Sequence, residues 1–418
     1  MPSTARPETP DSHAPRAPAT GLLLTGGGAR AAYQVGVLEA IADIRRACGV
    51  GRAPNPFPII AGTSAGAINA AALACGADDF GRTVRRMARA WRQVHAQQVY
   101  GADSLSVMRS GARWLTLLSV GWALARWRRM HPHSLLDNAP LEKLLAEMVP
   151  LERLPQLIRG GQLSALAVTA SSYSSGEHVT FFEAAQPLRP WVRSQRKAVC
   201  GPITHAHLLA SSAIPFVFPA RGLVLDGHTE YFGDGSMRQS APIAPAIHLG
   251  AERIVVIGAG RMHEPRDHTA VQPTPDYPSL AQIAGHALSN IFLDALAVDV
   301  ERVLRINQTL SLIPEERRAQ SALRPIELLV IAPSQRLDAV AARHVGDLPA
   351  PVRAMLGALG VSSSQADARS AALASYLLFE GGYTRELMAL GRADTLALRD
   401  KVCRFFGWSD GGAFLPAS

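Results

Sequence analysis

The chain has 418 residues, of which 48% are hydrophobic and 18% are charged, and its formal net charge is +8. This composition supports a globular core of one large or two ordinary domains. The four cysteines lie far apart without a Cys-x-x-Cys pair, and no His-Glu-x-x-His spacing occurs, which argues against a disulfide framework and a metal site. No segment reaches the about 18 uninterrupted apolar residues of a membrane span, and the N-terminus has no secretory signal. We therefore expect a cytoplasmic protein whose residues 1–20, rich in proline, alanine, serine and threonine, form a disordered tail.

The first ordered segment combines a strand, a glycine-rich loop and a helix. Residues 21–25 are apolar, Gly26, Gly27 and Gly28 follow, and residues 31–41 have helical periodicity. The backbone N–H groups of such a loop converge on an anion. That anion could be a nucleotide phosphate, since the loop fits the loose pattern Gly-x-Gly-x-x-Ala, or the oxyanion of an acyl-transfer intermediate. No Walker A motif occurs, and the next strand ends in a serine turn, so we favour the oxyanion hole.

The next strand-to-helix turn carries Ser64. Residues 57–60 predict a short buried strand, residues 67–74 predict a helix, and Ser64 lies between them with Gly62 and Gly66 two positions to either side. The Gly-x-Ser-x-Gly pattern is typical of a nucleophile elbow, whose sharp turn holds the serine in a strained backbone conformation. The following helix directs its N-terminal N–H groups toward the serine, where they stabilise negative charge. The alternative is a tight turn with a capping serine and no catalytic role.

The excess positive charge is concentrated in one region. From Arg82 to Arg129 the chain has ten arginines and one acid, Asp103, so this region alone carries a charge of +9. Residues 82–98 predict one amphipathic helix with an arginine face, and residues 114–125 are mostly apolar, with tryptophans close to arginines. Such a surface suits an anionic partner, and tryptophan beside arginine favours a membrane over a nucleic acid. The alternative is a solvated basic helix followed by a core helix.

Strands and helices alternate in the rest of the chain. The predicted elements are buried strands at 163–170, 253–258 and 326–331, an exposed edge strand at 178–183, and helical stretches at 280–310 and 336–404. Asp234, followed by Gly235, is placed at a strand end, where acidic residues of α/β sheets face the active-site edge. This order of elements predicts an α/β fold with a largely parallel sheet.

Three of these motifs occur in an order that resembles the patatin-like phospholipase family. They are Gly26-Gly27-Gly28-Ala29-Arg30, Gly62-Thr63-Ser64-Ala65-Gly66 and Asp234-Gly235, with Ala210-Ser211-Ser212-Ala213-Ile214-Pro215 between the last two. The resemblance covers about residues 21–250, and residues 134–138 and 375–379 are similar to segments of the larger bacterial members.

The resemblance implies a three-layer α/β/α fold and a Ser-Asp dyad, in which Ser64 is the nucleophile and Asp234 is its base. It places the oxyanion hole in the backbone N–H groups of Gly27, Gly28 and Ala29, with Arg30 fixing the loop and Gly26, Gly62, Gly66 and Gly235 supporting the motifs. We also expect partial desolvation of the Asp234 carboxylate, because a carboxylate with an ordinary pKa is a weak base for a hydroxyl. This mechanism requires no metal and no cofactor.

The sequence thus predicts a serine acyl hydrolase that cleaves fatty acyl esters of lipids or phospholipids. Its expected organisation is a catalytic core at 21–250, with a basic, tryptophan-rich insert or cap at 82–135, and a C-terminal extension at 251–418 packed on the core. The Arg82–Arg129 region is predicted to dock reversibly to anionic membranes at the inner membrane face.

Two other classes of protein remain as alternatives. One is an esterase of the α/β-hydrolase type with a Ser-His-acid triad, for which the candidate histidines are His248, His263, His268, His286 and His344. The other is a non-enzymatic module that binds a membrane or a nucleotide through the basic region and the glycine loop.

Overall fold

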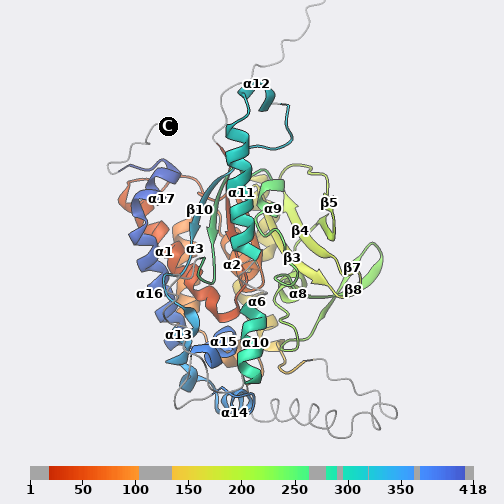
Figure 1. Ribbon diagram of the computed structural model, residues 1–418, viewed down its shortest axis with the longest axis vertical. Coiled ribbons are helices and arrows are strands. Elements are labelled where there is room, and N and C mark those ends of the chain that lie inside the picture. The colour runs from red at the N-terminus through yellow and green to blue at the C-terminus, as the bar shows by residue number, and fades with distance from the viewer. Residues whose placement is uncertain are drawn as a thin grey trace, which may run out of the picture.

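One mixed β-sheet with helices on both faces forms the centre of the molecule (Figure 1). The computed structural model describes residues 18–102, 134–262, 279–289, 295–318, 320–361 and 368–409. No helix within these ranges is both long enough and apolar enough to span a bilayer. The predicted apolar segment at 114–125 lies outside them.

Half of the sheet consists of parallel strands in the order β10-β9-β1-β2-β3. They are β1 (Thr20–Leu24), β2 (Ile59–Thr63), β3 (Ala165–Ser172), β9 (Arg253–Ile257) and β10 (Glu327–Ile331). β1, β2 and β3 are buried along their whole length, as their continuous apolar sequences predict. Leu22 and Leu24 enter one apolar core and Leu23 enters the other, because successive side chains of a strand point to opposite faces.

The other half of the sheet is mixed. β4 (His178–Ala184) is antiparallel to β3 and parallel to β6 (Arg196–Cys200), and β5 (Val192–Arg193) pairs with β6. A hairpin of β7 (Arg221–Leu225) and β8 (His228–Asp234) joins β3 through β8, which runs antiparallel to it.

The prediction of an exposed edge strand at 178–183 is wrong, because β4 is an interior strand whose first five residues are buried. Its polar residues alternate with apolar ones, but they form buried hydrogen bonds. His178 pairs with the carbonyl oxygen of Gly235, and the hydroxyl of Thr180 lies 3.4 Å from that of Thr169.

Helices complete the outer layers (Figure 1). The larger core joins one face of the sheet to α1 (Ala32–Ala47), α2 (Ala65–Ala74), α3 (Phe80–Arg92) and α16 (Gly381–Ala397). The second core joins the opposite face to α9 (Ala244–His248) and α11 (Ala295–Ser311). The remaining helices are α4 (Ala96–Val99), α6 (Ala139–Met148), α7 (Leu154–Arg159), α8 (His205–Ser211), α10 (Leu280–Ser289), α12 (Glu315–Arg318), α13 (Leu337–Ala342), α14 (Ala350–Ala358), α15 (Ala368–Leu377), α17 (Arg399–Phe406) and the 3-10 helices η1 (Gly28–Ala31), η2 (Leu151–Arg153) and η4 (Val345–Asp347).

The structure confirms the predicted three-layer α/β/α fold and corrects two boundaries. β1 begins at Thr20, inside the segment predicted to be a disordered tail, of which residues 1–17 lie outside the described ranges. The single helix predicted at 82–98 is two helices, because the His95 backbone is extended and its N–H donates to the Gln98 side chain instead of continuing α3. Residues 251–418 add β9 and β10 to the same sheet, while the division of the chain at 250 stays a prediction.

Candidate active site

Ser64 occupies the turn between β2 and α2. Its backbone has φ 56° and ψ −133°, a region that side-chain-bearing residues rarely adopt and that costs about 1–3 kcal/mol. The flanking glycines make this turn possible. A Cβ on Gly62 would collide with the carbonyl oxygen of Gly66, and a Cβ on Gly66 would collide with the carbonyl oxygens of the β1 end. The local sequence therefore creates the strained elbow that its glycine spacing predicts.

Sheet register brings Ser64 next to Asp234. β4 uses one edge of β3, so β2 and β8 share the other edge. The last residue of β2, Thr63, pairs with Thr169 of β3. The last residue of β8, Asp234, pairs with Ala170, which is the next residue of β3. The ends of β2 and β8 thus meet on β3, and Ser64 Oγ donates a hydrogen bond of 2.5 Å to Asp234 Oδ2.

The Asp234 carboxylate is completely buried, and burial raises its pKa from 3.8 to about 6. Hydrogen bonds from Ser64 and Ser236 oppose this shift, since they favour the charged form. One of them is the Ser236 backbone N–H, which donates to Oδ1 at 2.8 Å. The result agrees with the expected desolvated carboxylate, whose basicity is greater than that of an exposed aspartate.

The glycine loop lies at the carboxyl end of β1 and forms the 3-10 helix η1. Gly28 has φ 54°, and a Cβ there would collide with the backbone of Tyr376. The hydrogen bonding of η1 begins with the N–H of Arg30, which donates to the Gly27 carbonyl at 3.1 Å. The N–H groups of Gly28 and Ala29 precede that bond, so the helix itself gives them no acceptor. Gly28 and Ser64 border the same cavity.

Arg30 is buried and connects this loop to α15, far along the chain. Its Nε donates to the hydroxyl of Ser375 at 2.8 Å, and its guanidinium lies 4.1 Å from the ring centroid of Tyr376. The residues that hold Arg30, Ser375 and Tyr376, therefore lie outside the glycine-loop motif that predicted its role.

Two further polar residues, Ser211 and His178, support the Ser64–Asp234 pair. Ser211 belongs to a stretch that carries the family resemblance, but the sequence predicted no role for either residue. The hydroxyl of Ser211 accepts a hydrogen bond of 2.8 Å from the Ser64 backbone N–H and donates one of 2.6 Å to the Thr169 carbonyl. The Nε2 of His178 lies 2.6 Å from the carbonyl oxygen of Gly235, and burial lowers the pKa of this histidine to about 4. Neutral His178 therefore donates to the peptide that follows Asp234. In the sequence, the only indication of this role is that His178 is a polar residue at the start of a strand that proves to be buried.

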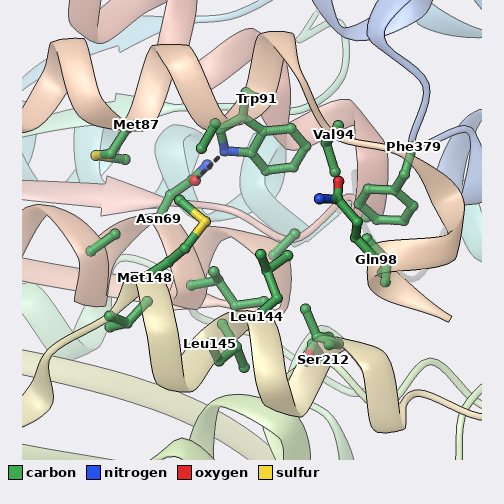
Figure 2. A pocket seen from close by; sticks show the side chains of 18 of the residues that line it. Asn69, Met87, Trp91, Val94, Gln98, Leu144, Leu145, Met148, Ser212 and Phe379 are labelled. Carbon is green, nitrogen blue, oxygen red and sulfur yellow. Dashed lines mark hydrogen bonds between the residues drawn. The ribbon is translucent and has the colours of Figure 1, made fainter.

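A chain of buried amides ties the glycine loop to α2 and α3. The Gln34 side chain donates to the Thr25 carbonyl at 2.7 Å and accepts from the Asn69 side chain at 3.0 Å. The indole N–H of Trp91 in turn donates to Asn69 Oδ1 at 2.9 Å (Figure 2). Because each buried polar group has a partner, the network fixes the loop and the two helices relative to one another.

Ser64 borders an apolar cavity of about 370 Å³, which is within the size range of small-molecule sites. α3 lies on one side of it and α6 on the other, and their side chains point into it (Figure 2). Leu141, Leu144, Leu145 and Met148 of α6 border the cavity. These residues follow the i, i+3, i+4, i+7 spacing of one helix face, a signal that was present in the sequence.

The structure describes three of the five candidate histidines of a Ser-His-acid triad, and two of these three have other partners. His344 lies 2.9 Å from Asp347 and 2.8 Å from Glu386, and the ring of His248 stacks on Trp191. His286 has an exposed side chain on α10, and His263 and His268 lie outside the described residues. Among the residues that the structure describes, no histidine forms a hydrogen bond with Ser64 or Asp234.

Fold and site together define an α/β protein in which a strained serine at a strand end is paired with a buried carboxylate beside an apolar cavity. The family model of the patatin-like phospholipases matches residues 22–247, which is more than half of the chain. The chain therefore belongs to the patatin-like phospholipase family. The glycine loop, the Ser64 elbow and Asp234 lie within the matched range, whereas Ser375 and Phe379 lie beyond it.

Two solved structures are similar to this chain at low identity. VipD from Legionella pneumophila is 13% identical with a TM-score of 0.32, over 92% of this chain and 67% of that chain. The human GIVD cytosolic phospholipase A2 is 12% identical with a TM-score of 0.38, over 94% of this chain and 63% of that chain. A sequence comparison with curated proteins finds no match.

Proposed function

We propose that this protein is a lipid acyl hydrolase that cleaves fatty acyl esters of lipids or phospholipids with Ser64 as nucleophile and Asp234 as general base. The observation that carries the proposal is the 2.5 Å hydrogen bond between these two side chains, together with the apolar cavity that Ser64 borders. Membership of the patatin-like phospholipase family supports the same reaction class.

In the first half-reaction Ser64 Oγ attacks the ester carbonyl carbon and transfers its proton to Asp234 Oδ2. The carbonyl oxygen becomes an oxyanion, which we assign to the N–H groups of Gly27, Gly28 and Ala29. Each such donor contributes about 3–4 kcal/mol of transition-state stabilisation in comparable sites. Collapse of the intermediate breaks the ester C–O bond, and the proton on Asp234 passes to the departing alcohol. Ser64 then carries the acyl group.

In the second half-reaction a water molecule is the nucleophile, and Asp234 is again the general base. Asp234 accepts a proton from the water as it attacks the acyl carbonyl, and that proton returns to Ser64 when the fatty acid leaves. The acyl chain occupies the cavity between α3 and α6, where apolar side chains replace its contact with water. A Ser-His-acid triad has less support, because His248 and His344 contact other residues and His286 has an exposed side chain.

Hydrolysis of a panel of phospholipids, neutral lipids and thioesters by the wild type, Ser64→Ala and Asp234→Asn tests this proposal. We expect both variants to lose at least about a thousandfold in kcat/KM. Labelling by a fluorophosphonate should require Ser64. His344→Ala is the matched control, because a triad would make it as damaging as Ser64→Ala. Full activity of Ser64→Ala contradicts the hydrolase proposal, and nucleotide-dependent thermal stabilisation without labelling favours the binding module instead.

We also propose that the arginine face of α3 docks the enzyme on anionic membranes, as a peripheral protein at the inner membrane face. The side chains of Arg82, Arg85 and Arg89 are exposed, and none forms an ion pair within the described part of the chain. Arg89 also borders the cavity. Phe216, 75% exposed, lies in sequence between two cavity residues, Ile214 and Phe218, and suits insertion at a lipid surface. The rest of the Arg82–Arg129 region, from 103 onward, lies outside the described residues.

Co-sedimentation with liposomes tests the docking surface. Each arginine near an anionic surface contributes about 1 kcal/mol, so replacing Arg82, Arg85 and Arg89 by glutamine should weaken binding about a hundredfold. The control replaces three exposed arginines elsewhere, Arg189, Arg193 and Arg305. Binding that is independent of anionic lipid and of salt would contradict the proposal.

A further inference from the structure

We infer that the far end of the cavity, formed by Ala72, Met87 and Met148 and bridged by Arg86, limits the length of the acyl chain that the enzyme accepts. This inference rests on the proposed function, since it assigns the cavity to the acyl group of the ester cleaved at Ser64. Ser64 borders the cavity, and we define the far end as the part most distant from Ser64 along the helices that line it.

α2 runs along the cavity away from Ser64. Ala65, Ile68, Asn69 and Ala72 border it, so one helix face follows it from the elbow for about 12 Å, at 1.5 Å per residue. α3 runs back along α2: near its start the Thr83 hydroxyl donates to the Gly76 carbonyl just after α2, and near its end the Trp91 indole donates to Asn69 within α2. Trp91 and Val94 therefore lie toward the Ser64 end, and Met87 lies toward Ala72.

α6 closes the other wall and runs in the same direction as α2. It begins beside α4, because the Gly101 N–H just after α4 donates to the Asp137 carbonyl just before α6, and its last residue, Met148, also borders the cavity. The guanidinium of Arg86 donates a hydrogen bond of 2.9 Å to the carbonyl oxygen of Met148. This bond joins α3 to the end of α6 across the tip of the cavity.

The chemistry of this end fits the terminal methyl group of an acyl chain. Met87 is buried, Met148 is half-buried, and both side chains are flexible and apolar (Figure 2). Ala72 is the smallest side chain here, so its size decides how far a chain extends. An additional methylene that meets this wall should lower kcat/KM about tenfold, the ordinary discrimination of an apolar pocket.

The test measures kcat/KM for a series of p-nitrophenyl esters from butyrate to palmitate, which gives each variant its own chain-length profile. Ala72→Leu fills the far end and should shift the optimum to shorter chains, lowering the ratio of long-chain to short-chain turnover about tenfold or more. Met148→Ala enlarges it and should raise that ratio. Met355→Ala is the matched methionine control, because Met355 lies on α14 and does not border the cavity.

The outcomes separate this inference from the proposed function. If the wild type hydrolyses the esters through Ser64 but Ala72→Leu keeps the wild-type profile, the inference is overturned and the hydrolase stands. If Ala72→Leu does not fold, an unchanged profile of Met148→Ala overturns it equally. If the wild type hydrolyses no ester of the series, not even butyrate, the proposed function fails first. A ratio within one variant does not depend on the fraction of folded protein.

Discussion

At the scale of the residue, Asp234 determines how the proposed reaction depends on pH. Only its ionised form can accept the Ser64 proton, and burial raises its pKa to about 6. We therefore expect kcat/KM to fall about tenfold per pH unit below pH 6 and to level off above it. Steady-state kinetics with a short-chain ester between about pH 5 and pH 8 provide the measurement. A flat profile across this range would exclude Asp234 as the base.

The same carboxylate makes the fold less stable at neutral pH. The pKa of Asp234 in the folded protein lies above the unfolded value of 3.8. Ionisation of Asp234 therefore lowers the free energy of unfolding, and this loss is absent at low pH and reaches its full size above about pH 6. The shift corresponds to about 3 kcal/mol. Asp234→Asn should therefore be inactive but more stable than the wild type by up to that amount at about pH 8.

Urea unfolding at several pH values measures this difference. The stability gain of Asp234→Asn should shrink as the pH falls from about 6 toward 4, where the folded wild type is protonated as well. Asp299→Asn is a useful comparison, because burial also raises the pKa of Asp299, which lies on α11 outside the candidate site. A gain that is the same at every pH would show that the effect does not arise from ionisation.

At the scale of the element, α15 completes a loop that the sequence motif describes only in part. Ser375 is fully buried, accepts the hydrogen bond from Arg30 Nε and donates one of 2.5 Å to the Ala372 carbonyl. Ser375→Ala leaves the guanidinium Nε–H without this acceptor, a cost of about 1–3 kcal/mol, and releases the loop. If the glycine loop forms the proposed oxyanion hole, it acts on the transition state, so we expect kcat to fall about tenfold to a hundredfold with a smaller change in KM.

Ser375→Thr serves as the matched variant, because it keeps the hydroxyl and should restore most of kcat. Thermal unfolding of both variants separates the two possible roles of Ser375. If Ser375→Ala loses stability but keeps the wild-type kcat, the residue supports the fold and does not position the glycine loop for the proposed reaction.

These elements also show how much could be predicted from the sequence. The glycine loop, the Ser64 elbow and Asp234 were identified because glycines mark turns that no other residue can form, and such signals are local. Residues 375–379 were noted only as similar to the larger bacterial members. The contact of Ser375 with Arg30 was not predicted, because the two residues are 345 positions apart in the chain. β4 was placed at an edge because its polar residues suggested solvent, whereas His178 and Thr180 form buried hydrogen bonds.

At the scale of the whole molecule, the C-terminal segment is part of the fold that holds the site. α16 lies along α1, and two glycines bring the helix backbones together: Gly36 faces the backbone of Met388, and Gly391 faces that of Tyr33. The hydroxyl of Tyr33 adds a hydrogen bond of 3.0 Å to Asp394. α1 directly follows η1, so its position sets the position of the glycine loop. The family match ends at 247, but the parts that fix its site extend to α16.

This packing predicts a global effect of a single methyl group. Gly391→Ala places a Cβ on the Tyr33 carbonyl and should destabilise the protein by about 1–3 kcal/mol, because neither helix backbone can give way without disturbing the core. Gly357→Ala on α14 is the matched control, since a Cβ there meets no atom within 4 Å and should stabilise the helix by about 0.5–1 kcal/mol.

Chemical denaturation tests this prediction. Far-UV circular dichroism follows the unfolding of the helices, and fluorophosphonate labelling of Ser64 follows the loss of the site along the same transition. The two transitions should coincide and shift together in Gly391→Ala, because α16, α1 and the glycine loop form one cooperative unit. Labelling that is lost well before the helices unfold would show instead that the site opens independently of α16.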